Sequence, residues 1–225
     1  RFTGIDMHIG SQITSTSPFE DSVEKLTETF FKVKDLGINL HHFDIGGGFG
    51  NQYLNEKVFS IQELANKLFP LFNKLKCKIF FEPGRFLTAN GGIIITKVIY
   101  NKCNKTKNFI VVDLGMNDLL RPSIYTAYHH IQPLKNNLHK DIEADIVGPV
   151  CESGDFIAKN RTIELVGQGE YLAVMSTGAY GTVMSSNYNA RRRPAEIMIE
   201  NDQWKIVRSR ESFEHLVFDE KEKLQ

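Results

Sequence analysis

The sequence predicts an α/β fold followed by an all-β region: a partial (β/α)8 barrel, about its last three βα units, and then an antiparallel β-barrel or sandwich domain. Three strand-like runs end near Gly10, Gly46 and Glu82, at a spacing of 36 residues. That spacing fits a strand, a loop, a helix and a return loop. After about Gly91 the apolar runs become short, β-branched or aromatic. The predicted barrel part is therefore 1–91, and the predicted β domain is 92–225.

Each predicted βα unit pairs a short apolar strand with an amphipathic helix. The strands are expected at 2–10, 40–45 and 78–81. The first helix is expected over 19–36, and the second follows the glycine cluster. Their apolar positions recur at helical spacing: Phe19, Val23, Leu26, Phe30 and Val33 in the first, and Ile61, Leu64, Leu68, Leu71 and Leu75 in the second.

The β domain is predicted from short runs separated by turn residues. These runs are 92–100, 108–113, 142–150, 162–166, 171–177, 196–200 and 204–207. The last segment, 211–225, reads as a charged terminal helix. In a βα barrel, chemistry collects at the carboxyl ends of the strands. Here those ends read HIGSQ, DIGGGFG and EPGR, which are more polar and richer in glycine than packing requires.

Composition excludes several classes of protein. The chain has 225 residues, 41% of them hydrophobic, with 27 basic and 27 acidic side chains and a formal net charge of zero. This balance argues against a nucleic-acid or membrane-surface binder, and the densest basic run, 191–193, is short. No apolar run is long enough to span a membrane, and no signal peptide is visible.

The cysteines and the first residue indicate the setting of the chain. Cys77, Cys103 and Cys151 are odd in number and far apart. They favour a reducing, cytoplasmic compartment over a disulfide framework or a zinc site. The sequence begins at Arg1 and enters an apolar run at once, which is expected for a piece of a longer protein.

The glycine cluster at Gly46, Gly47 and Gly48 has two interpretations. Glycines after a strand let peptide N–H groups close around a phosphate, because no Cβ blocks the approach. A tight turn into a helix is the commoner explanation for such a cluster. No Gly-Lys-Ser/Thr follows, and the spacing is not G-x-G-x-x-G, so neither a P-loop nor a dinucleotide site is predicted.

The other two strand ends also carry polar residues. His8 is either a hydrogen-bonded structural histidine or a site residue, and Ser11 offers a hydroxyl to a phosphate. Glu82 emerges from a buried strand before a Pro-Gly turn. A carboxylate in that position needs a cationic partner, which is either Arg85 or an atom of a ligand.

The segment 113–133 combines Arg121 and Tyr125 across a proline-restricted turn. Arginine presents a planar fork suited to a carboxylate, and tyrosine adds a directional hydroxyl. His129 and His130 are adjacent, so their side chains diverge, and no third ligand is evident. No metal site is predicted.

Two later segments carry further candidates. Cys151 lies in a polar turn beside Glu152. It is either a buried structural thiol, the usual fate of a cysteine, or a proton donor or nucleophile. Tyr180 sits in a glycine-flanked bend. It is either an exposed loop tyrosine or a hydroxyl aimed at an anion.

Taken in order, six motifs resemble the diaminopimelate decarboxylases. These motifs are HIGSQ, DIGGGFG, EPGR, DLGMNDLLRPSIYTAYH, GPVCESGDF and GAYGTVMSSNYNARRRP, and the likeness runs from Gly4 to about Glu200. The family belongs to the pyridoxal-phosphate-dependent amino-acid decarboxylases with an alanine-racemase-like barrel. The segments RPSIYTAYH and CESGD favour the diaminopimelate enzyme over its ornithine and arginine relatives. This chain resembles the C-terminal portion only.

The resemblance implies decarboxylation of meso-diaminopimelate to L-lysine with pyridoxal 5′-phosphate as cofactor. In the family the glycine cluster, a serine and a tyrosine hold the phosphate, a histidine stacks on the ring and a glutamate pairs with the ring nitrogen. The implied cofactor-binding residues are His8, Ser11, Gly46, Gly47, Gly48, Glu82 and Tyr180. The implied substrate-binding residues are Arg85, Arg121, Tyr125 and Glu152, and the implied catalytic residues are Cys151, Glu82 and His8.

The chain departs from the family in one decisive respect. The family's lysine that attaches the cofactor lies on an early barrel strand, upstream of everything here, and neither Lys78 nor Lys97 follows a family motif. The chain alone is therefore expected to be marginally stable, to bind the cofactor weakly and to be inactive without an N-terminal portion. A smaller departure is Thr177, where the family usually has alanine.

Partners follow from the same resemblance. In the family the Cys-Glu segment reaches into the partner subunit's site, which implies a homodimer. A separate N-terminal chain is a further expected partner. Two other functions stay open: a non-catalytic remnant or regulator that docks onto an intact homologue, and a decarboxylase of another diamino acid.

Overall fold

The computed structural model describes residues 2–135 and 140–221. The chain divides into two compact units, Arg1–Gly92 and Ile93–Gln225, which we call the N-terminal unit and the sheet unit. Each is described by itself. Among the described residues, no helix combines the length and the hydropathy that crossing a bilayer requires.

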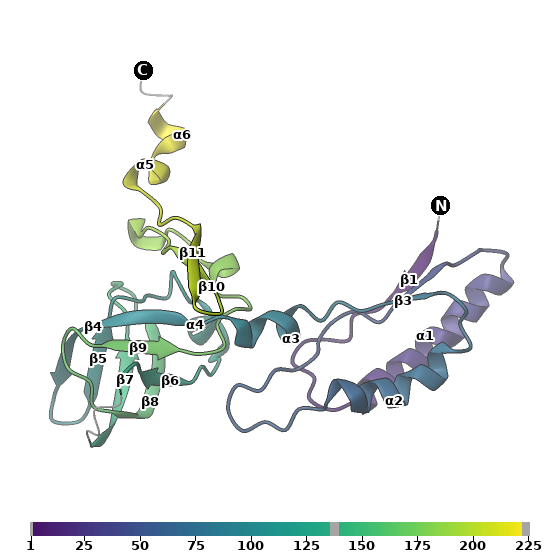
Figure 1. Ribbon diagram of the computed structural model, residues 1–225, viewed down its shortest axis with the longest axis horizontal. Coiled ribbons are helices and arrows are strands. Elements are labelled where there is room, and N and C mark those ends of the chain that lie inside the picture. Colours follow the sequence, from purple (N-terminus) through teal and green to yellow (C-terminus); the bar gives the residue numbers. More distant parts are fainter. Residues whose placement is uncertain (1, 136–139, 222–225) are drawn as a thin grey trace. The chain divides into compact units, whose positions relative to one another are not determined.

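The N-terminal unit is a three-stranded parallel sheet with two helices between its strands (Figure 1). The elements run β1 (Gly4–Asp6), α1 (Ser17–Asp35), β2 (His42–Asp44), α2 (Ile61–Phe72) and β3 (Lys78–Phe80), and the strand order is β1-β2-β3. A short helix α3 (Gly84–Thr88) and a 3-10 turn η1 (Ala89–Gly91) follow. The predicted succession of βα units is confirmed, whereas closure into a barrel stays a prediction.

Local chemistry favours the start of both long helices and the end of the first. Pro18 stands in the first turn of α1, and Lys32 and Lys34 lie in its last turn, near the negative end of the helix dipole. Ser60 caps α2, because its side chain accepts a hydrogen bond from the Glu63 N–H at 3.1 Å.

The two helices cover one face of the parallel sheet. Ile5, Phe43 and Ile79 pack into a core with the apolar faces of α1 and α2. The fully buried aromatic rings of this core meet edge to face, as Phe30 does with Phe43 at 5.8 Å between centroids. Because side chains alternate along a strand, Asp6, Asp44 and Phe80 project from the opposite face.

The sheet unit contains a six-stranded mixed sheet (Figure 1). Its strands are β4 (Ile94–Cys103), β5 (Asn108–Val112), β6 (Ile131–Pro133), β7 (Asp141–Val147), β8 (Phe156–Glu164) and β9 (Tyr171–Val174), in the order β6-β9-β4-β5-β7-β8. The two end strands, β6 and β8, also contact each other, so the sheet is nearly closed.

The prediction of a purely antiparallel domain is wrong. β5 and β7 pair in parallel, with Asn108 opposite Ala144 and Val111 opposite Val147, while the other neighbouring pairs are antiparallel. A parallel pair needs a long crossover. The chain between β5 and β7 is long enough, and it includes helix α4 (Arg121–Tyr125) and strand β6.

The sheet encloses a core of aliphatic side chains. Its buried members are Val98, Ile110, Val112, Leu114, Leu119, Ile131, Ala144, Ile146, Ile157, Ala158, Ile163, Val166, Leu172 and Val174. The two cores differ in chemistry, since buried phenylalanines dominate the N-terminal unit and branched aliphatic residues dominate this one.

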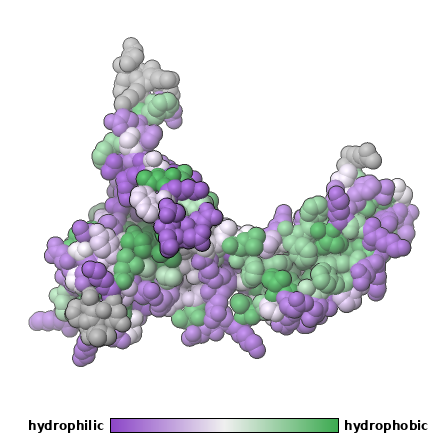
Figure 2. All heavy atoms as spheres, viewed as in Figure 1, coloured by the Kyte–Doolittle hydropathy of each residue, from purple (hydrophilic) through white to green (hydrophobic). Residues whose placement is uncertain are grey.

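A separate hairpin and short helices complete the sheet unit. The hairpin pairs β10 (Glu196–Glu200) with β11 (Gln203–Arg208). The 3-10 turns η2 (Thr182–Met184) and η3 (Tyr188–Ala190) precede it, and α5 (Phe213–Leu216) and α6 (Phe218–Lys221) follow it. Two short helices thus replace the predicted terminal helix over 211–225, of which 222–225 lie outside the described residues. Apolar side chains remain exposed on the hairpin, including Ile199 and Trp204. Figure 2 shows hydrophobic residues, in green, at the surface of the protein.

Candidate active site

The N-terminal unit brings its three strand ends together through backbone hydrogen bonds. The Met7 N–H donates to the Asp44 carbonyl at 3.2 Å, and the Glu82 N–H donates to the Gly46 carbonyl at 2.9 Å. The Ile13 N–H donates to the Gly48 carbonyl, also at 2.9 Å. The segments that hold His8, Ser11, the glycine cluster and Glu82 are therefore neighbours at one edge of the sheet.

Glycines are required in this cluster because neighbouring backbone lies against them. A Cβ on Gly46 would collide with the Met7 carbonyl, one on Gly47 with the Glu82 carbonyl, and one on Gly48 with the Gly10 carbonyl. Gly46 and Gly48 also have φ of +69° and +87°, which favour glycine. Close packing of the three strand ends thus explains the glycines.

The N–H groups of the cluster differ in what they bind. The Gly46 N–H donates to the Asp44 carboxylate, with 2.9 Å between N and Oδ1. The N–H groups of Gly47 and Gly48 have no acceptor within the described part of the chain. Buried backbone donors are rarely left without a partner. Two adjacent N–H groups in this state fit an anion such as a phosphate.

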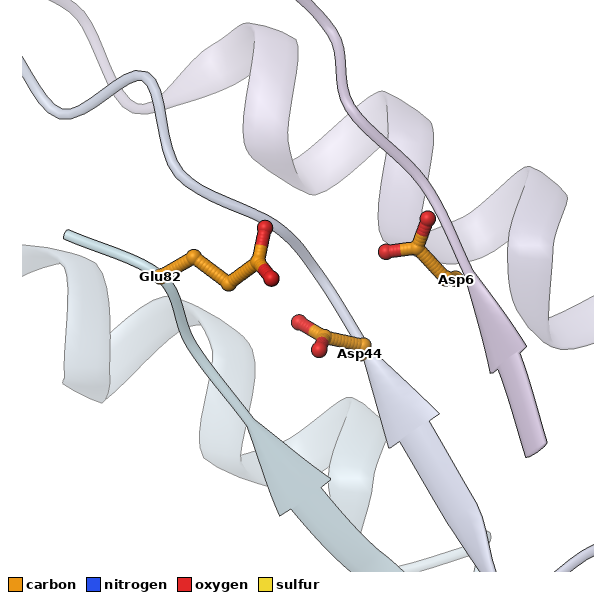
Figure 3. A group of neighbouring side chains, drawn as sticks. All are labelled: Asp6, Asp44 and Glu82. Carbon is orange, nitrogen blue, oxygen red and sulfur yellow. The ribbon is translucent and has the colours of Figure 1, made fainter. Parts of the chain in front are cut away.

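Three carboxylates converge on the uncovered face of the sheet (Figure 3). Asp6, Asp44 and Glu82 each place one oxygen so that these atoms all lie within 4.8 Å of one another. Their mutual repulsion favours a cation, which is either a metal ion or a protonated nitrogen of a ligand. Only Glu82 was predicted from the sequence. Asp6 and Asp44 were missed, although each follows a residue of the buried strand face and they lie directly opposite in the strand register.

Arg85 lies in α3, just after Glu82, and its Nη1 donates to the Tyr53 hydroxyl at 3.0 Å. His8 and Ser11 follow β1 and are exposed. The cofactor and substrate roles of these three residues stay predictions.

In the sheet unit, Arg121 and Tyr125 stand at the two ends of α4. Arg121 is only 6% exposed, and its Nη1 lies 2.9 Å from Nε2 of His129. Tyr125 is 65% exposed. The predicted proline-restricted turn is therefore one turn of helix that buries the guanidinium and presents the phenol to solvent.

Cys151 and Glu152 lie in the turn between β7 and β8, and Cys151 is exposed, which contradicts the buried-thiol interpretation. Buried Asp155 shapes this turn, because its two carboxylate oxygens accept the N–H groups of Val150 and Met116, each at 2.6 Å. Burial raises the pKa of Asp155, and these two hydrogen bonds oppose the rise.

The same turn is tied to its neighbours on both sides. The Ser123 hydroxyl of α4 donates to the Gly154 carbonyl at 2.6 Å. The Tyr188 hydroxyl lies 3.4 Å from Oε2 of Glu152, and the Gly154 N–H donates to Oε1 of the same carboxylate at 3.2 Å. Arg121, the Cys151–Glu152 turn and the segment around Tyr188 thus belong to one connected region.

Tyr180 lies after β9 in a strained bend. Its φ is +59°, and Ser176 has a φ of +55°, both in the left-handed region that non-glycine residues seldom adopt. Such strain occurs often at functional sites. Tyr180 is exposed, so both interpretations of this tyrosine remain compatible with its surroundings.

Partly buried ion pairs hold the loops around this region. Arg191 contacts Asp118 at 3.5 Å and donates from Nε to Oδ1 of Asn117 at 2.8 Å. Burial raises the pKa of Asp118, and Arg191 opposes that rise. Arg193 pairs with Glu211 at 2.8 Å. Two members of the basic run are therefore structural, a role that the sequence did not reveal because their partners lie far along the chain.

The predicted site residues thus form two groups. The N-terminal unit holds His8, Ser11, Gly46, Gly47, Gly48, Glu82 and Arg85, and the sheet unit holds Arg121, Tyr125, Cys151, Glu152 and Tyr180. The first group suits an anion beside a cation, and the second combines a buried guanidinium, a phenol, a thiol and a carboxylate.

Comparison with known proteins identifies the class. Residues 15–178 match the model of the family described as pyridoxal-dependent decarboxylase, C-terminal sheet domain, and the chain belongs to that family. Among curated relatives, the diaminopimelate decarboxylase of Aquifex aeolicus is 50% identical over 215 residues, which are 95% of this chain and 51% of that protein. The diaminopimelate decarboxylase of Haemophilus influenzae is 43% identical over 218 residues, which are 96% of this chain and 52% of that protein.

A solved structure agrees with these relatives. The diaminopimelate decarboxylase of Helicobacter pylori, crystallised with L-lysine, is 37% identical, with a TM-score of 0.93 over 98% of this chain and 55% of that one. The chain therefore spans about half the length of the proteins it matches.

Proposed function

We propose that this chain forms the C-terminal half of a pyridoxal-phosphate-dependent enzyme that decarboxylates meso-diaminopimelate to L-lysine. The observation that carries the proposal is the pair of N–H groups on Gly47 and Gly48, which have no acceptor in the described part of the chain. The neighbouring residue Glu82, whose backbone carbonyl packs on Gly47, adds a carboxylate that lies close to those of Asp6 and Asp44. That arrangement fits a ligand with a phosphate at one end and a cationic nitrogen at the other. The diaminopimelate decarboxylases among the relatives support this choice of reaction.

The N-terminal unit would bind the cofactor. Gly47 and Gly48 would donate N–H groups to the phosphate, with Ser11 adding a hydroxyl donor, and His8 would lie against the ring. Tyr180, which belongs to the sheet unit, is likewise proposed as a hydroxyl donor to the phosphate. Glu82 would keep a proton on the ring nitrogen, and Asp6 and Asp44 add negative charge beside it. When bound, pyridoxal phosphate withdraws the electron pair released as carbon dioxide departs.

The sheet unit would hold much of the substrate. Arg121 and Tyr125 would bind a carboxylate of the substrate, and Glu152 would bind its distal ammonium group. Arg85, which belongs to the N-terminal unit, is likewise proposed as a ligand of a substrate carboxylate. The exposed Cys151 thiol would donate a proton to the substrate α-carbon in place of the lost carboxylate.

The exposure of Cys151 and Glu152 also supports a homodimer in which this turn serves the partner's site. The lysine that attaches the cofactor in the family has no counterpart among the motifs of this chain. We therefore propose that the 225-residue chain alone is inactive.

Reconstitution tests the reaction. The chain is fused behind the N-terminal half of the Aquifex aeolicus relative, and carbon dioxide and L-lysine are measured with pyridoxal phosphate and meso-diaminopimelate. We expect turnover from the fusion and none from the 225-residue chain alone. An inactive fusion that folds and dimerises would contradict the reaction, and turnover by the unfused chain would contradict the need for the missing half.

A glycine substitution tests the proposed phosphate site at Gly47 and Gly48. In the fusion, Gly47→Ala places a methyl group against the Glu82 carbonyl, whereas Gly84→Ala meets nothing within 4 Å. We expect Gly47→Ala to weaken cofactor binding at least about tenfold, because losing a hydrogen bond to a charged group costs about 1.5–3 kcal/mol. The control Gly84→Ala should bind as the parent does. Equal affinities of the two variants for the cofactor would rule out the phosphate site at Gly47 and Gly48.

A further inference from the structure

His129 is the most deeply buried histidine in the neighbourhood of the predicted substrate residues. It is 0% exposed, and both of its ring nitrogens are engaged. Nε2 lies 2.9 Å from Nη1 of Arg121, and Nδ1 lies 2.9 Å from the carbonyl oxygen of Met175. Nothing in the proposed reaction uses this side chain directly.

The two contacts define which nitrogen carries the proton. A carbonyl oxygen only accepts hydrogen bonds, so Nδ1 of His129 must donate to Met175. A guanidinium only donates, so Nε2 must accept from Arg121. Both contacts are hydrogen bonds only in the neutral tautomer with the proton on Nδ1. A second proton would set an N–H of His129 against an N–H of Arg121.

The imidazole is itself held in place by separate strands. Arg161 of β8 donates from Nη1 to the backbone carbonyl of His129 at 2.9 Å, and its guanidinium lies 4.0 Å from the centre of the Tyr128 ring. Met175 follows directly after β9. His129 therefore connects Arg121 to two strands of the sheet, and its ring has little freedom to turn.

We propose that His129 is a positioning residue that orients the guanidinium of Arg121 toward a carboxylate of the substrate. The inference rests on the proposed function, since it assigns Arg121 to an anionic group of the substrate. Arginine carries five N–H donors in a planar fork. A hydrogen bond at one Nη fixes the plane of that fork, and a fixed plane is what recognition of a carboxylate by two parallel hydrogen bonds requires.

Two substitutions separate positioning from simple support of the core. His129→Gln places an amide oxygen near the position of Nε2 and so keeps an acceptor for Arg121. His129→Asn places an amide N–H near the position of Nδ1 and so keeps only the contact with Met175. Each variant loses one buried hydrogen bond, and the exposed neighbour His130 supplies the control His130→Asn.

The variants are compared in the fusion with the Aquifex aeolicus half. We expect His129→Asn to raise the KM for meso-diaminopimelate about tenfold with a smaller change in kcat, because a hydrogen bond to a charged group is lost. His129→Gln and His130→Asn should stay within about twofold of the parent. Equal KM values for His129→Asn and His129→Gln would overturn the proposal.

Nuclear magnetic resonance of the 225-residue chain keeps this test distinct from that of the reaction. The ¹⁵N signals of the His129 ring, assigned by their loss in His129→Gln, should show a protonated Nδ1 and an unprotonated Nε2. Arg121→Gln should shift the Nε2 signal and leave Nδ1 unchanged. A proton on Nε2 would overturn the positioning role even in an active fusion. An inactive fusion that shows the expected signals would contradict the reaction and the substrate role of Arg121, but not its contact with His129.

Discussion

The two units of the chain organise their candidate site residues in different ways. In the N-terminal unit, short parallel strands end together, and the candidate site consists largely of backbone carbonyls and N–H groups of the glycine cluster. In the sheet unit, buried side chains such as Arg121, His129 and Asp155 hold the loops through hydrogen bonds between distant segments. The geometry of the glycine cluster therefore depends on the strands that precede it, whereas the geometry around Arg121 depends on hydrogen bonds between side chains.

The two units also differ in how completely they enclose their cores. Only one face of the three-stranded sheet is covered by helices, and β1 and β3 each pair with β2 alone. The six-stranded sheet nearly closes on itself around its aliphatic core. Open edges leave backbone groups unpaired, and a bare face leaves side chains uncovered. We therefore expect the N-terminal unit to be the less stable of the two.

The largest expected effect comes from the aromatic core of the N-terminal unit. Phe43→Ala removes a fully buried ring that contacts Phe30 and Phe72, with 6.3 Å between the centroids of Phe43 and Phe72. Truncation of a buried phenylalanine costs about 3–5 kcal/mol. We expect amide hydrogen exchange to lose protection throughout the N-terminal unit while β4 to β9 keep theirs.

Ile146→Ala is the matched substitution in the sheet unit, since Ile146 is also fully buried. It should cost about 2–5 kcal/mol and reduce protection in the sheet unit alone. If either substitution unfolded both units together, their stabilities would be coupled, and the comparison between them would fail.

The next effect concerns a buried carboxylate in the sheet unit. Asp155→Asn retains one oxygen, so one of the N–H groups of Val150 and Met116 would face the new amide N–H. Leaving a buried donor without an acceptor costs about 1–3 kcal/mol. We expect urea unfolding at neutral pH to show this loss.

Thiol labelling gives a second measurement on the same variant. Because Asp155 orders the turn that carries Cys151, the rate of reaction of this exposed thiol with a maleimide should change in Asp155→Asn. The rate at Cys103, which lies at the end of β4, should not change. An unchanged Cys151 rate would show that Asp155 supports the core but not the turn.

Local patterns in the sequence predicted the helices of the N-terminal unit well. The first helix was expected over 19–36 and runs from Ser17 to Asp35, because its apolar face lies directly on the core. The first strand was expected over 2–10, but β1 ends at Asp6. Beyond it, Met7 makes a single hydrogen bond to β2 before the chain turns away.

Elements of the sheet unit that depend on distant contacts were not predictable. The first half of β8 was missed because Lys159, Asn160 and Arg161 interrupt its apolar pattern. The register shifts there, and the Asn160 N–H donates to Oδ1 of Asp145 at 2.7 Å. A hydrogen bond between residues on two strands leaves no periodic signal in the sequence.

The candidate site shows the same division. The motif around Arg121 predicts a role for that residue, whereas the sequence around its partner His129 raises only the question of a metal ligand beside His130. Their contact requires the chain to reverse after α4, where Thr126 has a φ of +52°. A threonine in the left-handed region is not expected from local preference, so this reversal could be seen only in the folded structure.

The smallest expected effect is a dependence of stability on pH in the sheet unit. The Glu211 carboxylate accepts hydrogen bonds from the Arg193 N–H and guanidinium and from the Asn187 amide, and these contacts lower its pKa to about 2. A lowered carboxyl pKa stabilises the fold above the ordinary value of 4.5, and this contribution is lost as the pH falls from 4.5 to about 2. Allowing for partial exposure, Glu211→Gln should cost about 1–2 kcal/mol at pH 6.

The pH dependence of stability can therefore be compared between the two units. In urea unfolding, the difference between Glu211→Gln and the parent should shrink steadily below pH 4.5 and vanish near pH 2. Glu20→Gln is the counterpart in the N-terminal unit, where a hydrogen bond from the exposed Lys67 lowers the pKa of a half-buried carboxyl. Its effect should be smaller, because solvent and salt screen an exposed pair. If the difference in the free energy of unfolding between Glu211→Gln and the parent did not depend on pH, Glu211 would stabilise the sheet unit by packing and not by its charge.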